Sequence, residues 1–349
     1  MNSRIYAYMM ACLAMLLLAG RPLSAADGRL RLVRDNAQRS FSSSVPAGNY
    51  SGITPLGGSL YAVVSDKSPY EGFYIFDISI DTITGKIDSV RNKGFVYAVS
   101  HDGDTLPNRD HEGIVFLPHS NTFFISGEKD NNIFEYMPDG RATGKRLALP
   151  PVYSGISSNY GFESLAYDNG FRRFWTVTES TIPADGPQAN PQNPVRNRLR
   201  LQCFNDSLQP CGWCYYEMEP PLAKKRPAMY AMGVSELCAL DDGRLLVLER
   251  EAFVSKRKFG SFVNCRLFVV SPYSVLQAQD ADSAETVAKE ELVSFRTRIS
   301  LIGFSFANYE GMCLGPQLYD GSRVVILISD SQNRYKGVLK DWFKTIVIR

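Results

Sequence analysis

Carboxylates recur at two fixed positions of a pattern that repeats along this sequence. The pattern is a short apolar run, a turn rich in Gly, Asp, Asn or Pro, and a second apolar run. Acids begin the first run at Glu112, Glu163, Glu236 and Glu310, and they end the second run at Asp66, Glu128, Glu179, Glu249 and Asp330. Oxygen donors in such number, in a chain with 3 histidines, favour Ca²⁺ or Mg²⁺ over zinc or copper.

These acids can act together only if the fold gathers them. Two apolar runs joined by a turn predict an antiparallel hairpin, whose first residue and last residue lie at the same end. Nine clustered carboxylates repel one another unless cations, Lys or Arg side chains, backbone N–H groups or protons compensate them. The alternative interpretation is structural: each glutamate holds a neighbouring loop through backbone hydrogen bonds.

Basic residues stand beside several of these acids, and a hydrolytic mechanism that uses both can be stated as a hypothesis. In this hypothesis a cation on the carboxylates binds a substrate phosphate, and Lys67, Arg109 and Arg250 neutralise its remaining charge. A water then attacks, with Glu112 or Glu128 as the general base. The mechanism needs no protein nucleophile, which agrees with the absence of a Gly-x-Ser-x-Gly motif from the sequence.

The repeat predicts the fold that would position these residues. Five hairpins start near Ser51, Glu112, Glu163, Glu236 and Glu310, and further strand candidates lie between them. Those candidates are 73–80, 86–99, 132–137, 146–152, 199–205, 213–218, 265–270 and 291–299. We expect an all-β protein, a β-propeller of five four-stranded blades, in which strand 29–34 pairs with strand 345–349 and closes the ring. Six blades with one degenerate repeat, or two sandwich domains, are the alternatives.

The first 26 residues resemble a secretory signal peptide. Arg4 precedes an apolar run from Tyr6 to Ala19, which is shorter than a membrane span, and small residues follow it. We therefore expect a periplasmic or secreted protein with one domain over residues 27–349. Removing Arg4 and Arg21 with the leader leaves 36 basic and 36 acidic residues, a balance that argues against nucleic acid and anionic membranes as partners. We expect a monomer.

An exported chain can keep disulfides, and removal of the leader would leave six cysteines. Folding the strand-like runs 197–205 and 212–219 symmetrically about their turn places Cys203 opposite Cys214, which makes them the disulfide candidate. Zinc held by Cys203, Cys211 and Cys214 is the rival interpretation, although no second Cys or His pair has metal spacing.

Taken in order, the five segments resemble the phytase-like propeller family, described as having esterase-like activity of phytase. The matching stretches are Ser51-Gly-Ile with Val64-Ser-Asp-Lys67, Asp110-His-Glu-Gly-Ile114 with Ser126-Gly-Glu128, Gly161-Phe-Glu-Ser-Leu165 with Thr178-Glu179, Val234-Ser-Glu-Leu237 with Leu246-Val-Leu-Glu-Arg250, and Asn308-Tyr-Glu-Gly-Met312 with Leu327-Ile-Ser-Asp330. The resemblance implies a propeller and hydrolysis of a small phosphate or carboxylic ester. A binding module with structural calcium, which recognises a glycan, peptide or envelope partner without turnover, is the competing function.

Overall fold

A computed structural model describes residues 28–156, 160–280, 282–300, 303–337 and 339–349 of the chain. The expected leader, residues 1–26, lies outside this described part. The chain divides into a short unit, Met1–Arg31, and a large unit, Leu32–Arg349, and the large unit contains all the strands described below. No helix of the described residues has the length and apolar character needed to cross a bilayer.

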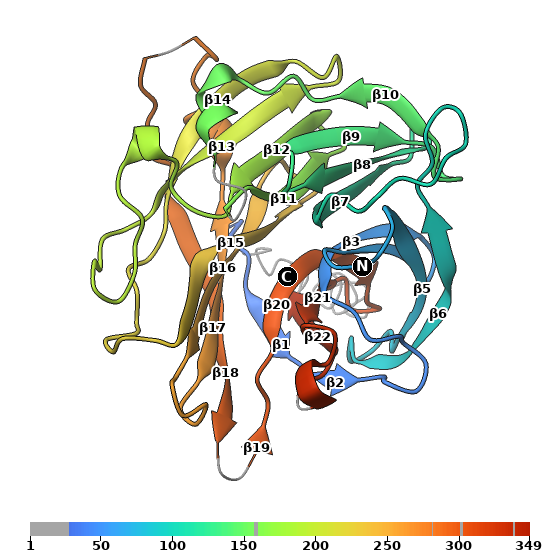
Figure 1. Ribbon diagram of the computed structural model, residues 1–349, viewed down its shortest axis with the longest axis vertical. Coiled ribbons are helices and arrows are strands. Elements are labelled where there is room, and N and C mark those ends of the chain that lie inside the picture. The colour runs from blue at the N-terminus through green and yellow to red at the C-terminus, as the bar shows by residue number, and fades with distance from the viewer. Residues whose placement is uncertain (1–27, 157–159, 281, 301–302, 338) are drawn as a thin grey trace, which may run out of the picture. The chain divides into compact units, whose positions relative to one another are not determined.

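The large unit is a β-propeller whose five antiparallel sheets, the blades, follow one another along the chain (Figure 1). Blade one consists of β3 (Tyr50–Gly57), β4 (Leu60–Ser65), β5 (Gly72–Ile80) and β6 (Ile87–Tyr97). Blade two consists of β7 (His111–Leu117), β8 (Thr122–Gly127), β9 (Asn132–Tyr136) and β10 (Ala142–Arg146). Blade three consists of β11 (Phe162–Asp168), β12 (Arg173–Thr178), β13 (Arg198–Asn205) and β14 (Pro210–Glu217).

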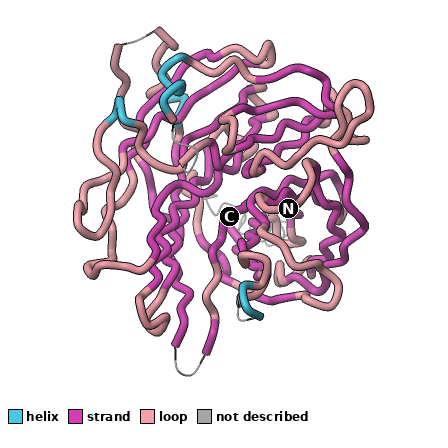
Figure 2. The backbone as a smooth tube through the Cα atoms, viewed as in Figure 1, coloured by secondary structure: helices cyan, strands magenta, loops and turns pink. Residues whose placement is uncertain are grey.

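Blades four and five complete the ring. Blade four consists of β15 (Met229–Ala239), β16 (Leu245–Val254), β17 (Phe262–Val270), β18 (Lys289–Ser300) and the short β19 (Gly303–Phe304). Blade five consists of β20 (Asn308–Gln317), β21 (Arg323–Asp330), β22 (Trp342–Ile348), β1 (Leu32–Asp35) and β2 (Arg39–Ser40). Helical structure in the described residues is limited to the 3₁₀ turns η1 (Pro151–Gly155), η2 (Pro183–Asp185), η3 (Pro272–Ser274) and η4 (Tyr335–Gly337) (Figure 2).

The closure of the ring is as predicted from the sequence. Strand β1 pairs antiparallel with β22, with Leu32 opposite Ile348, so chain segments from both ends share blade five. One expected strand is wrong: the fourth strand of blade two is Ala142–Arg146, whereas the expected range 146–152 leads into η1. Pro150 and Pro151 explain the difference, because proline cannot donate to a strand ladder but suits the first turn of a helix.

The hydrophobic core lies between neighbouring blades. Tyr50 and Phe76 of blade one pack with Val324 and Phe343 of blade five, and similar clusters join blades one to two, two to three and three to four. Each blade is therefore stabilised by its neighbours, as expected for radial repeats.

The first strands of the blades, β3, β7, β11, β15 and β20, form the inner wall of the ring and approach closely. A Cβ atom at Gly52 would lie 2.3 Å from the carbonyl oxygen of Glu112, and one at Gly113 would lie 2.8 Å from the backbone nitrogen of Leu165. Only glycine fits at these positions without displacing the neighbouring backbone, so Gly52 and Gly113 allow the tight spacing of β3, β7 and β11.

Candidate functional site: a carboxylate cluster at one end of the inner strands

A local irregularity positions one side chain at the start of each inner strand. The ladder between first and second strand shifts after Tyr50, His111, Phe162, Val234 and Tyr309. The residues at the shift, in blade order, are Ser51, Glu112, Glu163, Ser235 and Glu310. A β-bulge of this kind redirects a side chain, and it does so here in every blade.

The ends of the second strands provide the other half of the cluster. Each of the residues before the bulge (Tyr50, His111, Phe162, Val234 and Tyr309) pairs with a residue of the second strand. The residues that directly follow these partners are, in blade order, Asp66, Glu128, Glu179, Arg250 and Asp330. We call Asp66, Glu112, Glu128, Glu163, Glu179, Glu310 and Asp330 the carboxylate cluster. Because the first two strands of each blade are antiparallel, these positions lie at the same end of the inner strands, and Arg250 contacts three of the seven acids.

Two acids predicted for the carboxylate cluster, Glu236 and Glu249, lie elsewhere. The repeat positions of blade four are one residue away from those predicted from the sequence. Glu249 pairs with Val234 and so takes the repeat position that Thr178 has in blade three. The Glu249 carboxylate accepts hydrogen bonds from the Tyr216 hydroxyl at 2.7 Å and Lys289 Nζ at 2.6 Å. Arg250 therefore takes the repeat position predicted for an acid.

Glu236 occupies the position of Gly113, Ser164 and Gly311, one residue beyond the bulge. Its Oε1 atom accepts backbone N–H groups from Leu165 at 3.1 Å and Leu237 at 3.0 Å. It thus joins β15 to β11 by backbone hydrogen bonds, which is the structural alternative described for the glutamates.

Burial, and for most of them the charges of neighbouring acids, raise the pKa values of Asp66, Glu112, Glu128, Glu163, Glu310 and Asp330. Burial first, and then the charges of Glu163, Asp66, Glu310 and Glu128, hold the pKa of Glu112 well above its usual range. Burial and the charge of Asp330 raise the pKa of Asp66 to about 7, although Lys67 lowers it. The cluster therefore holds protons, or attracts cations, at neutral pH.

The pKa of Glu128 is also raised, for partly different reasons. Burial raises its pKa to about 7, opposed by a hydrogen bond from the Gly161 backbone N–H at 3.3 Å, and the charge of Glu179 raises it further. A carboxyl group with a pKa close to neutral can exchange protons with a substrate or a water.

Arg250 compensates one side of the cluster. Its guanidinium, 4% exposed, donates hydrogen bonds to Glu179 and Glu310, and its Nη2 atom lies 3.6 Å from Glu163 Oε2. Asn308 fixes this arrangement, because its amide accepts from Arg250 at 3.0 Å and donates to Glu310 at 2.7 Å. Carboxylates from blades three and five thus accept hydrogen bonds from both Nη atoms of Arg250, whereas its buried Nε atom has no hydrogen-bond partner among the described residues.

The other side, formed by Asp66, Glu112 and Glu128, has weaker compensation. Lys67 is its nearest cation, 3.2 Å from Asp66 and 3.6 Å from Asp110, and 57% of the lysine side chain is exposed. Lys129 pairs with Asp110 at 3.2 Å and is equally exposed. The structure gives no hydrogen bond or ion pair to the Glu112 carboxylate from the described residues, although Glu112 is 6% exposed.

Unsatisfied oxygens indicate what this side could hold. Asp66 Oδ1, Asn49 Oδ1 and Asn131 Oδ1 are buried acceptors without a hydrogen bond in the described part of the chain. Such oxygen donors fit a hard divalent cation, although no three His, Cys, Asp or Glu side chains of the described residues already converge on one point. Asp66, Glu112 and Glu128 are the residues that would hold the ion.

Arg109 lies away from the cluster. Its guanidinium contacts Glu71 at 2.8 Å and Asp130 at 2.8 Å, and it stacks on the Phe134 ring. Glu71 also contacts His111 Nε2 at 3.0 Å. Burial alone would raise the pKa of Glu71, but the hydrogen bond with His111 and the charge of Arg109 outweigh burial, so the pKa lies below its usual value. Arg109 thus serves a buried ion-pair network and is not available to a substrate.

Sequence reasoning assigned no role at the site to Asn308, Asp110 or Glu71. Asn308 could have been found, because it stands two residues before Glu310 and directly opposite Asp330 in the hairpin. Asp110 has a left-handed backbone with a φ of 55°, a conformation common for Asp but not encoded by any motif here. Glu71 directly precedes β5, the third strand of blade one, and nothing in its spacing distinguishes it from a surface acid.

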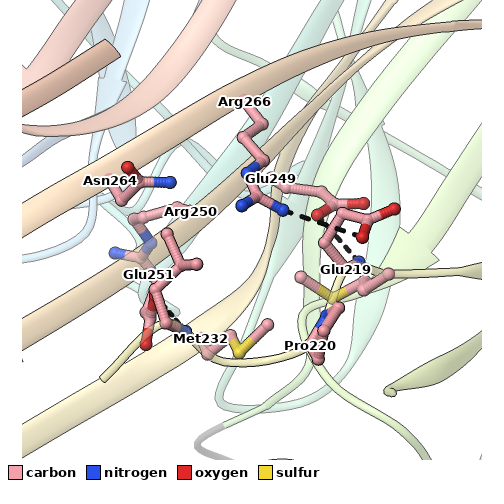
Figure 3. A pocket seen from close by; sticks show the side chains of 10 residues that line it. Glu219, Pro220, Met232, Glu249, Arg250, Glu251, Asn264 and Arg266 are labelled. Atoms are coloured by element: carbon pink, nitrogen blue, oxygen red, sulfur yellow. Dashed lines mark hydrogen bonds and ion pairs between the residues drawn. The ribbon is translucent and has the colours of Figure 1, made fainter. Parts of the chain in front are cut away.

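A small pocket of about 220 Å³, including its open space, is lined by Arg250 and by its two neighbours on β16, Glu249 and Glu251. Figure 3 shows Glu219, Glu249, Glu251 and Arg266 around it. Glu251 accepts backbone N–H groups from Leu222 at 3.0 Å and Ala223 at 2.8 Å, so its carboxylate is already used to hold the β14–β15 connection. We assign this pocket a structural role.

Comparison with solved structures finds similarity to two bacterial proteins. An endo-arabinase from Bacteroides thetaiotaomicron has 10% identity and a TM-score of 0.43, covering 89% of this chain and 96% of that one. A duf4221 family protein from Bacteroides vulgatus has 10% identity and a TM-score of 0.42, covering 92% and 98%. At these values the two likenesses carry no argument about function. No curated protein matches the chain.

A protein-family comparison is more informative, because it matches nearly the whole propeller. The family model described as phytase-like, esterase-like activity of phytase, matches residues 45–332, which include all the residues of the carboxylate cluster. The chain therefore belongs to the phytase-like family.

Proposed function

We propose that the carboxylate cluster is the active site of a hydrolase of phosphate or carboxylic esters that works with bound Ca²⁺ or Mg²⁺. Membership of the phytase-like family supports the ester chemistry. The observation that carries the proposal is the buried Glu112 carboxylate, which lacks a protein partner among the described residues while four other acids oppose its ionisation. A group in this state requires a proton or a cation.

An anionic ester could not approach this many carboxylates without positive charge. A cation held by Asp66, Glu112 and Glu128 would supply that charge and polarise the ester oxygen. Lys67 and Lys129 lie at the exposed rim of the same side and attract the anion toward it. Arg250 keeps Glu163, Glu179 and Glu310 in place, and we treat it as a positioning residue.

Glu128 is the preferred general base. Because its pKa is about 7, both protonation states are populated near neutral pH, so it can take a proton from the attacking water and return it to the leaving group. Burial and four neighbouring acids hold the pKa of Glu112 well above its usual range and disfavour its ionised form, so Glu112 is the weaker candidate for the base.

The test is an activity panel of phosphomonoesters and carboxylic esters, assayed with Ca²⁺, with Mg²⁺ and after EDTA treatment. We expect turnover that depends on the cation and falls at least about 100-fold in Glu128→Gln, the usual range for loss of a general base. The matched control is Glu290→Gln, the same chemical change at an exposed position of β18. Equal loss in the control would contradict a specific role for Glu128.

The competing function makes a different prediction for the same protein. A binding module with structural calcium gains thermal stability from the cation but hydrolyses no ester of the panel. That outcome would overturn the proposed hydrolase while keeping the cation site. Absence of both stabilisation and turnover would reject the cation as well.

A further inference from the structure

The sulfur atoms of Cys203 and Cys211 lie 3.2 Å apart across the β13–β14 hairpin. The ladder pairs Cys203 with Gly212 and Phe204 with Pro210, so Cys211 is an extra residue on β14 at a bulge. This bulge brings Cys211 beside Cys203. Cys214 instead pairs with Leu201 in the ladder, so the predicted partnership of Cys203 with Cys214 is wrong in register.

The two thiols differ in access and acidity. Cys203 is fully buried among core residues of blades three and four, whereas Cys211 is partly exposed. The hydrogen bond between the two sulfurs lowers the pKa of the Cys211 thiol to about 7, and the charge of Arg173 adds to this against the effect of burial. Cys211 is thus the thiolate that a reagent meets first.

We propose that Cys203 and Cys211 are a disulfide-forming pair, oxidised by exchange with an external disulfide. The Cys211 thiolate attacks one sulfur of the external disulfide, forms a mixed disulfide and releases one thiolate. Cys203 then loses its proton and attacks Cys211 Sγ, which forms the Cys203–Cys211 bond and releases the second thiolate. Two electrons pass to the external disulfide, and the two protons leave with its reduced thiols.

Formation of the bond requires little rearrangement, because the two sulfurs are already in contact and a disulfide brings them to about 2 Å. The bond closes the turn between β13 and β14, the outer half of the blade whose inner strands carry Glu163 and Glu179. It therefore fastens the outer edge of blade three without touching the carboxylate cluster, and the inference does not depend on the proposed activity.

The test treats the full-length reduced protein with a mixture of oxidised and reduced glutathione, followed by alkylation of free thiols. Chymotryptic cleavage after Phe204 and Trp213 separates Cys203, Cys211 and Cys214 onto different peptides. We expect a linked pair of peptides that contains Cys203 and Cys211 and has lost two hydrogen atoms in mass. A Cys203–Cys214 link, glutathione adducts alone, or full alkylation of both thiols would overturn the proposal.

Variants separate this pair from its neighbour. Cys214→Ser should form the same link as the wild-type protein, and Cys211→Ser should form none. Oxidation should raise the melting temperature of the wild-type protein and of Cys214→Ser by a few degrees, and leave Cys211→Ser unchanged. Because Cys211 is partly exposed, its replacement preserves the fold even if Cys203→Ser does not. Equal melting temperatures before and after oxidation, with the link present, would show that the bond does not stabilise the hairpin.

Discussion

Arg250 donates a hydrogen bond to the Glu179 carboxylate, although the two residues occupy equivalent positions in consecutive blades. One repeat has thus exchanged the acid of its neighbours for a base. The exchange divides the carboxylate cluster into two sides. Arg250 compensates the negative charge around Glu163, Glu179 and Glu310, whereas other cations must compensate it around Asp66, Glu112 and Glu128.

Replacing Arg250 by Met should destabilise the protein strongly. It removes the guanidinium from three buried carboxylates, and loss of one partner from a buried ion network costs about 3–5 kcal/mol. Denaturant unfolding measures the change. The matched control is Arg141→Met, whose ion pair with Asp139 is exposed and contributes at most about 1 kcal/mol. Equal effects of the two substitutions would show that Arg250 does not hold the cluster.

The five hairpins and the closure of the ring are predictable, because they depend on local patterns of apolar strands and turns. The spacing between acids does not predict which residues of blade four occupy the repeat positions. Glu236 and Glu249 both stand one residue from the repeat positions. Alignment on Leu237, which packs in the core as Leu165 does, would have placed Ser235 and Arg250 correctly. Apolar residues are the safer guide, because packing fixes them in every blade.

The cysteine contact could not be predicted by folding the two strands symmetrically. A single extra residue on β14 changes which side chain faces Cys203, and no turn motif in the sequence predicts this bulge. The contact between Arg109 and Glu71 could not be predicted from local sequence patterns either. Its partner Glu71 lies 38 residues earlier in the sequence, so their contact depends on how blades one and two pack.

Without added cation, the free energy of unfolding should fall as the pH rises from about 4 toward 7. Asp66 and Glu128 have pKa values of about 7 when folded, against about 4 in an unfolded chain, so the folded protein binds more protons in that interval. The double variant Asp66→Asn, Glu128→Gln should show a shallower decline in pH-dependent denaturation. Identical pH profiles for the variant and the wild-type protein would contradict the raised pKa values.

Calcium or magnesium should stabilise the protein more at pH 8 than at pH 5. Protons compete with a cation for carboxylates, and fewer protons occupy Asp66 and Glu128 at the higher pH. Thermal melts with the cation and with EDTA at both pH values measure the difference. The double variant should lose most of the stabilisation, whereas Glu290→Gln should keep it. Equal stabilisation of both variants would place the ion elsewhere.

Glu236 should be replaceable by Gln but not by Ala. The Gln side-chain oxygen can still accept the N–H groups of Leu165 and Leu237, whereas Ala leaves those buried donors unsatisfied, at a cost of about 1–3 kcal/mol. Denaturant unfolding of both variants measures this. If Gln were as destabilising as Ala, the structural role assigned to these hydrogen bonds would be wrong.

Gly113→Ala should destabilise the ring by about 1–3 kcal/mol, the usual range for overpacking. The new Cβ atom would lie 2.8 Å from both the backbone nitrogen and the Cβ atom of Leu165, so β7 and β11 would have to separate. Gly155→Ala is the control, because nothing lies within 4 Å of a Cβ there. Since Glu112 precedes Gly113, the separation should also reduce cation-dependent stabilisation. A Gly113→Ala protein as stable as the control would show that close contact between inner strands does not constrain the cluster.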